Sequence, residues 1–239
     1  MNLKILPLFH LHGSPLHIDL ILEETNIPRS SLYRQIKGLI NAGLIEAVGK
    51  GIYAPGWLAD EISRVKEDSV NKLIETALPL MQEINEDIGE SVNLTAVKGS
   101  KVRVLTHLES KHNLKYSYEE GQILDIFKGA SSKILLAYLS ENHRQFLIDS
   151  NFAPECGVKL NQELEKIRND EFAVTNSEVD ENAIGLSVPI LRRGKYILGG
   201  LSIAGPAFRI KGDKINNYIE RLKEAAYDIS LLLDDENIF

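Results

Sequence analysis

The sequence predicts an α+β protein made of two parts, and three observations support this fold class. Residues 16–56 contain two short amphipathic segments, a tight turn and a pair of short β segments, in that order. Residues 58–88 repeat apolar side chains at the spacing of a long helix. From residue 90 onward, segments rich in β-branched and aliphatic residues group with helical segments, which is typical of an antiparallel sheet covered by helices.

The first part has the pattern of a helix-turn-helix. The turn lies at residues 26–28, and Pro28 suits the start of a helix because it lacks an N–H group and has a fixed φ. Gly43 is expected to end this second helix, since glycine readily adopts the left-handed conformation found at helix ends. Pro7 indicates that the first helix of the chain is short or kinked. The stripe expected to face the core is Leu32, Ile36, Leu39 and Ile40.

The outward face of the second helix carries hydrogen-bond donors and no carboxylate. Phosphates and base edges are rich in acceptors, so this face suits the major groove of DNA. Segments 45–48 and 52–54 are expected to pair as a hairpin, or wing, with Lys50 at its tip. The simpler alternatives are a solvated basic helix and a helix-turn-helix that binds another protein. The predicted DNA-binding residues are Arg29, Ser30, Ser31, Tyr33, Arg34, Lys37 and Lys50.

The distribution of charge supports this division of the chain. The formal net charge of the 239 residues is −7, which argues against a protein that coats nucleic acid regardless of sequence. In residues 1–57, however, the basic side chains outnumber the acidic ones by one, so the acidic excess lies in the remainder. We therefore expect DNA to repel the body of the protein and only the N-terminal part to approach it.

The sequence also bears on the compartment. Cys156 is the single cysteine, which excludes an intramolecular disulfide and fits a reducing cytosol, and we interpret it as a loop thiol. No apolar run approaches the ~20 residues of a membrane span. Residues 1–9 lack the small-residue cleavage site of a signal peptide. We expect a cytoplasmic protein that does not contact a membrane.

The boundary between the two parts falls near residue 57. The apolar phase slips between Val65 and Val70, which predicts that a short linker helix meets a second helix at a bend. Pro79 is expected to kink that second helix, and Gly89 to end it. The predicted organisation is a winged helix-turn-helix domain at 1–57, a linker helix at 58–69 and a C-terminal domain at 70–239.

The C-terminal domain is expected to have a sensor-type α+β fold. The predicted strands are 92–97, 102–108, 122–127, 185–191 and 196–204. The predicted helices are 131–139, 163–170 and one that begins at about residue 213.

No metal, cofactor or catalytic residue is expected. His10, His12 and His17 have no cysteine or acidic cluster beside them, and residues two apart on a helix project in different directions. Residues 131–133 lack the Ser-x-x-Lys spacing of an acyl-transfer enzyme.

Five segments together carry a family resemblance. They are IPRSSLYRQIKGLINAGLIEAVGKGIYAPG, GESVNLTAV, KGASSKILLAYL, FAVTNSE and VPILRRGKYILGGLSIAGPAFRI. In this order and spacing the chain resembles the IclR family of bacterial transcriptional regulators over nearly its whole length. The resemblance implies an N-terminal winged helix, a linker helix and a C-terminal effector-binding domain related to GAF-like small-molecule sensors. It also implies dimers or tetramers and control of genes for the use of carbon sources.

The resemblance further implies an effector site. The family's helix-opening loop matches residues 130–134, where backbone N–H groups would hold a ligand carboxylate, as helix N-termini hold anions. Some members have Asp where this chain has Thr175, and Ser132 and Ile134 replace the usual Gly and Ala. The implied effector-binding residues are Ala130, Ser131, Thr175, Asn176 and Gly185. The simpler alternative is that residues 130–131 only begin a helix and residues 175–176 only form a turn.

The predicted function is a ligand-responsive DNA-binding transcriptional regulator, of the repressor type, for metabolic genes, with a small organic acid as effector. A single wing and helix offer few basic groups, so a homodimer or homotetramer on a palindromic operator is expected. Leu58, Ile62 and Val65 would form its seam. One alternative is an enzyme that acts on a small carboxylate and carries a fused winged helix. Another is a protein–protein adaptor.

Overall fold

The computed structural model describes residues 3–235 and divides into two compact units, Met1–Ser69 and Val70–Phe239, which are described separately. Residues 1–2, which open the N-terminal segment considered for a signal peptide, lie outside the described residues. Within the described part, no helix is long and apolar enough to cross a bilayer.

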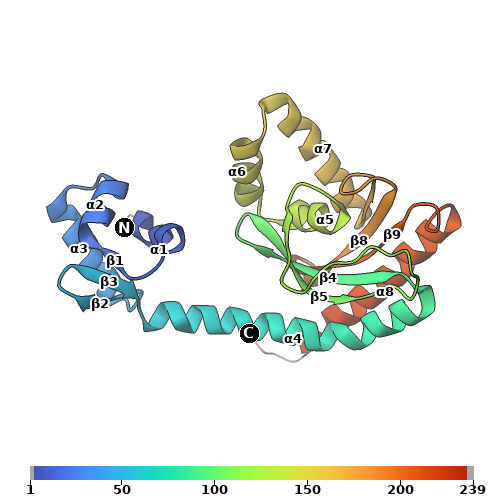
Figure 1. Ribbon diagram of the computed structural model, residues 1–239, viewed down its shortest axis with the longest axis horizontal. Helices are drawn as coiled ribbons and strands as arrows, with labels where there is room; N and C mark the ends of the chain where they lie inside the picture. Colours follow the sequence, from blue (N-terminus) through green and yellow to red (C-terminus); the bar gives the residue numbers. More distant parts are fainter. Residues whose placement is uncertain (1–2, 236–239) are drawn as a thin grey trace. The chain divides into compact units, whose positions relative to one another are not determined.

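The first unit contains the predicted order of helix, turn, helix and hairpin (Figure 1). Its elements are the 3-10 helix η1 (Leu3–Ile5), α1 (Leu6–His12), β1 (Leu16–His17), α2 (Ile18–Thr25), α3 (Arg29–Asn41), β2 (Ile45–Gly49) and β3 (Ile52–Pro55). The three strands form an antiparallel sheet in the order β1-β3-β2. Pro7 lies in the first turn of the short helix α1, where its missing N–H group leaves no intrahelical bond unmade.

The core of this unit is narrower than the sequence predicts. Leu32, Ile36 and Leu39 of α3 are buried together with side chains of η1, α1, α2 and the sheet. Ile40, by contrast, is 37% exposed, so its prediction as a core residue is wrong. It lies one residue beyond Leu39 and hence about 100° further around the helix, at the solvent edge of the stripe.

A single helix, α4 (Trp57–Ile88), follows the hairpin, so the prediction of two separate helices here is wrong. The side chains of residues 61–68 are all exposed, and Ser69 Oγ donates to Val65 O at 2.7 Å. The slip in the apolar pattern therefore falls where the helix passes from an exposed segment to the segment that packs in the core of the second unit, from Val70 onward. The backbone continues as a helix, and Pro79 lies inside it.

The second unit is built on a six-stranded antiparallel sheet in the order β6-β5-β4-β9-β8-β7. Its strands are β4 (Ser91–Lys98), β5 (Lys101–Leu108), β6 (Ile123–Asp125), β7 (Ala173–Asn176), β8 (Ala183–Arg192) and β9 (Tyr196–Pro206). Its further helices are α5 (Ala130–Tyr138), α6 (Glu141–Asn151), α7 (Pro154–Asp170) and α8 (Asp213–Asp235).

Helices cover both faces of this sheet (Figure 1). The part of α4 within this unit packs with α8 on one face, around Met81, Leu201 and Leu222. Helices α5, α6 and α7 pack on the other face, around Ile134, Leu147 and Leu164. This is the predicted α+β class, with a sheet covered by helices.

Two local interpretations in this unit are wrong, and one helix has no counterpart among the predicted ones. Residues 175–176 lie in strand β7, so the turn interpretation fails, and Thr175 pairs with Gly185 of β8. Helix α6 was not expected. Helix α7 begins at Pro154, a residue suited to the first turn of a helix, so exposed Cys156 is a helical residue and not a loop thiol.

Candidate functional sites

The outward face of α3 is accessible along its whole length. Arg29, Ser30, Arg34 and Lys37 are exposed, and Tyr33 is 45% exposed. Ser31 is half-buried. Helix α3 contains no acidic residue, so the surface that it offers is made of guanidinium, ammonium, hydroxyl and phenol groups.

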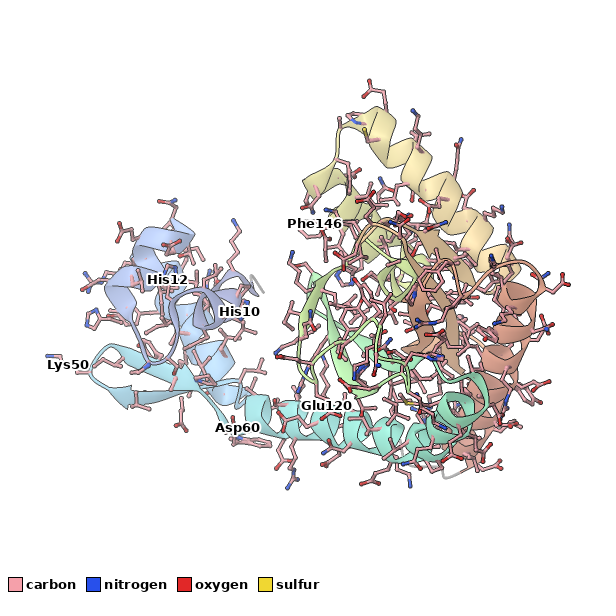
Figure 2. The ribbon with its side chains drawn as sticks, turned by 45° about the vertical axis from the view of Figure 1, so that its right-hand side comes forward. His10, His12, Lys50, Asp60, Glu120 and Phe146 are labelled. Atoms are coloured by element: carbon pink, nitrogen blue, oxygen red, sulfur yellow. The ribbon has the colours of Figure 1, made fainter. Side chains whose placement is uncertain are left out.

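The hairpin adds another exposed basic side chain to the unit that contains α3. Lys50 is exposed in the two-residue turn between β2 and β3, and Figure 2 shows it projecting from the hairpin tip. Gly51 follows it with φ of +71°, a conformation that favours glycine. Burial raises the pKa of the neighbouring Tyr53, and the nearby phenol of Tyr33 adds to the shift. Tyr53 is 7% exposed and Tyr33 45%, so Tyr33 is the accessible phenol of the two.

Two glycines fix where the hairpin joins α4. A Cβ on Gly43, whose φ is +73°, would lie 2.4 Å from Trp57 Nε1. A Cβ on Gly56 would lie 2.5 Å from Gly43 O. Leu58 N donates to that same carbonyl at 2.9 Å. Only residues without a Cβ permit this close approach, which anchors the start of α4 to the end of α3.

In the second unit, a pocket lies at the N-terminus of α5, and residues from the β5–β6 connection, α5, β7 and β8 line it. Ala130, Ser131, Thr175 and Gly185, four of the predicted effector residues, are among them. Asn176 is not part of the lining. It is the exposed neighbour of Thr175, and successive strand residues point to opposite faces.

The polar groups at the start of α5 bond to nearby side chains. Ala130 N donates to Thr175 Oγ1 at 3.0 Å, and Gly129 N donates to Glu178 Oε2 at 3.2 Å. Ser131 Oγ lies 2.8 Å from Ser202 Oγ. Two N–H groups at this helix terminus, of the kind that bind an anion, are thus bonded to acceptors of this chain.

A buried cation lies one turn into the helix. Lys133 is 6% exposed, and its Nζ donates to Glu163 Oε1 and to Glu178 Oε1, both at 2.6 Å. Burial lowers the pKa of Lys133, but the two carboxylates outweigh burial and raise the pKa above its ordinary value. The ammonium group therefore remains charged beside the pocket.

Aromatic side chains form another wall of the pocket. The rings of Tyr116 and Tyr118 meet edge to face, with centroids 5.3 Å apart. Tyr116 Oη donates to Asp180 Oδ2 at 2.6 Å. Burial, followed by this hydrogen bond, raises the pKa of Tyr116. Its phenol is therefore neutral at physiological pH.

The cavity between these walls is small. Its volume is about 30 Å³, enough for about one or two water molecules. The empty space including the open mouth is about 410 Å³. A ligand with several non-hydrogen atoms must therefore displace part of the lining.

Comparison with known proteins identifies the family. The model of the bacterial transcriptional regulator IclR C-terminal domain matches residues 67–231. The chain belongs to the IclR family.

Several known proteins match this chain over nearly its whole length. The chain is 23% identical to the HTH-type transcriptional regulator KipR of Bacillus subtilis, over 96% of this chain and 94% of KipR. It resembles the crystal structure of Thermotoga maritima IclR with a TM-score of 0.63 and 25% identity, over 97% and 96% of the two chains. It also resembles an IclR homologue from Microbacterium hydrocarbonoxydans in complex with 4-hydroxybenzoate, with a TM-score of 0.64 and 20% identity, over 97% of each chain.

The predicted absence of a metal site in this IclR-family chain stays a prediction. Among residues 3–235, no group of three or more His, Cys, Asp or Glu side chains is placed to hold a metal ion. His12 Nε2 instead lies 3.2 Å from Glu24 Oε1.

Sequence reasoning missed several residues in or beside the pocket of this family member. Lys133 immediately precedes the apolar helical run 134–137, and a lysine beside such a run requires a partner if it is buried. That signal was available. Glu178, Tyr116 and Tyr118 had none, because they come from loops whose position depends on the assembled sheet.

Proposed function

We propose that this IclR-family transcriptional regulator binds operator DNA through the outward face of α3 and Lys50, and responds to a small organic acid at the N-terminus of α5. The main support is that the chain has two separate surfaces suited to these two partners. One is an acid-free, donor-rich helix face, and the other is a helix N-terminus that opens into a pocket beside a buried lysine. The proposed domains are 1–57 for DNA, 58–69 as linker and 70–239 for the effector.

Three features support a carboxylate as the effector. Helix N-termini bind anions, and here the pocket contains Ala130, Ser131 and Lys128. The aromatic wall of Tyr116 and Tyr118 suits an apolar or planar body. The homologue from Microbacterium hydrocarbonoxydans was solved with 4-hydroxybenzoate, a molecule with both features.

An oligomer of identical chains is part of the proposal. Of the predicted seam residues on α4, Ile62 and Val65 are 57% and 55% exposed and Leu58 is half-buried, while the nearby Trp57 is 66% exposed. Such a row of apolar side chains is typical of a surface that a second copy covers. Two copies would also present two reading helices to a palindromic site.

The relatives are named transcriptional regulators, which favours regulation over the enzyme alternative. We therefore propose no catalytic role, no cofactor and, since bacterial operators lie there, a cytoplasmic location. The target genes are proposed to be metabolic, with the protein acting as a repressor.

Two measurements test the proposal. A gel shift with the DNA upstream of the protein's own operon should show a specific complex that competitor DNA does not remove. A thermal-shift screen of small carboxylic acids should find a ligand that raises the melting temperature and changes operator affinity. By linkage, operator DNA must change the affinity for that acid by the same factor. A specific ligand that is cationic would overturn the anion-site assignment.

A further inference from the structure

The loop between β7 and β8, residues 177–182, lies over the anion-binding end of the pocket. Val179 from this loop lines the pocket, and a Cβ placed on Gly129 would be only 2.8 Å from its Cγ2. Asp180 bonds to Tyr116 on the opposite wall at 2.6 Å. Glu178 extends from the same loop toward the start of α5. The loop therefore closes the space that an effector needs.

Glu178 makes the contacts expected of a bound carboxylate. Its Oε2 accepts a hydrogen bond from Gly129 N at 3.2 Å, and its Oε1 accepts one from Lys133 Nζ at 2.6 Å. One oxygen is thus bonded to the helix N-terminus and the other to a buried ammonium group. This combination is a strong site for a carboxylate, because the hydrogen bond to the ammonium group is charge-assisted.

An independent observation shows that the site has unused binding capacity. Ser132 lines the pocket, is 1% exposed, and its Oγ has no hydrogen-bond partner among the described residues. A buried hydroxyl without a partner is unfavourable, since it has lost its hydrogen bonds to water. A ligand oxygen in the pocket would supply the missing partner.

We propose that Glu178 is a built-in competitor that occupies the carboxylate position of the effector. The effector's carboxylate displaces Glu178 from Gly129 N and Lys133 Nζ, bonds in addition to Ser132 Oγ, and releases the loop 177–182. This inference rests on the proposed function, because it assumes that a small organic acid binds at α5. It adds the residues that bind the acid, and the loop whose release reports its presence.

The surroundings of Lys133 make this exchange feasible. When Glu178 leaves, the ammonium group keeps Glu163 at 2.6 Å, so no buried charge is left without a counter-ion. The side chain of Glu178 is already 32% exposed, so water can solvate it once it is released. Two carboxylates at one helix N-terminus would repel each other, so binding and displacement must occur together.

Calorimetric titration of the full-length protein with 4-hydroxybenzoate, and separately with acetate, tests this inference. We expect Glu178→Gln to bind 4-hydroxybenzoate at least tenfold more tightly than the wild type, because the neutral amide competes poorly for Lys133. Glu178→Asp keeps the charge but is one methylene shorter, so it should also bind more tightly, by a smaller factor. Glu181→Gln removes the same charge from an exposed position of the same loop and should bind like the wild type.

The outcomes separate the inference from the proposed function. Equal or weaker binding of the probes by Glu178→Gln, in a protein with wild-type circular dichroism, overturns the competitor role. An increase of the same size in Glu181→Gln also overturns it, because the effect would then be one of net charge. If no variant binds either probe, the inference fails. A gel shift on the same samples shows independently whether the DNA-binding half of the proposed function stands.

Discussion

Helices α3 and α5 both present polar groups to a partner, but they do so in opposite states. The basic side chains of α3 are exposed, whereas the N–H groups that begin α5 are bonded to Thr175 and Glu178. DNA can therefore meet α3 without breaking contacts in the protein. An effector at α5 has to exchange its own contacts for existing ones. DNA binding at α3 therefore depends on charge and salt concentration. Effector binding at α5 depends on the free energy of the internal hydrogen bonds that the effector replaces.

The largest effect is expected on the stability of the second unit when the buried ammonium group of Lys133, beside the start of α5, is removed. Lys133→Met leaves Glu163 and Glu178 facing each other without a counter-ion, and should destabilise the second unit by ~2–4 kcal/mol, near the range for breaking a buried ion pair. Urea denaturation followed by far-ultraviolet circular dichroism measures the loss. Lys128→Met, which removes an exposed lysine at the pocket, is the control and should change little. Equal stability of the two variants would mean that the ion pairs contribute nothing.

The second prediction addresses α3. Arg34→Ala should weaken operator binding by ~1–3 kcal/mol if the guanidinium contacts a base, while Arg34→Lys recovers only part of the loss because it lacks the two-pronged geometry. Lys37→Ala and Lys50→Ala should weaken binding evenly across DNA sequences and reduce the salt slope by about one. Affinity is measured by fluorescence anisotropy at several salt concentrations. Wild-type operator affinity in a folded Arg34→Ala protein would remove α3 as the reading helix.

A smaller effect is expected at the start of α5. Thr175→Val keeps the shape of the side chain but leaves Ala130 N without its acceptor, which should cost ~1–2 kcal/mol of stability. Asn176→Ala changes the exposed neighbour and should cost almost nothing. Hydrogen exchange at Ala130 should quicken in the first variant alone. Unchanged exchange would show that the bond to Thr175 does not protect the helix start.

The smallest effect is a pH dependence confined to the second unit. Burial lowers the pKa of His107 below the ordinary 6.5, although nearby Glu109 and Glu120 act in the opposite direction. The unfolded chain therefore takes up a proton before the folded one does, and stability falls as the pH drops below about 6.5 until the folded histidine titrates. Denaturation curves between pH 7.5 and 5.5 should show this fall in the wild type and in His112→Gln, and a smaller fall in His107→Gln.

The contrast between the two regions also explains what could be predicted from the sequence. The 13 residues of α3 contain both the buried stripe and the outward face, so helical spacing alone separates them. The same spacing misassigned Ile40, which lies at the boundary of the stripe. At residues 66–69 the slip in phase predicts two helices, but every residue there is compatible with a helix and the structure has one continuous helix.

The pocket was harder to predict because its parts are far apart in the chain. Family resemblance supplied Ala130, Ser131, Thr175 and Gly185, all of which line it. Glu178 reaches Gly129 across 49 residues of sequence, and Tyr116 reaches Asp180 across 64. Such contacts depend on strand pairing, such as that of Thr175 with Gly185, which local patterns do not encode.

The contact between Trp57 and Gly43 has a spectroscopic consequence. Trp57 is the chain's one tryptophan, and its indole lies against the glycine that ends α3. Excitation at the red edge of protein absorption therefore excites only Trp57, at the junction of the hairpin and α4. The tyrosines near the effector pocket do not absorb at this wavelength. A shift in the emission of Trp57 on adding an organic acid would therefore report that binding in the second unit changes the surroundings of this junction in the first.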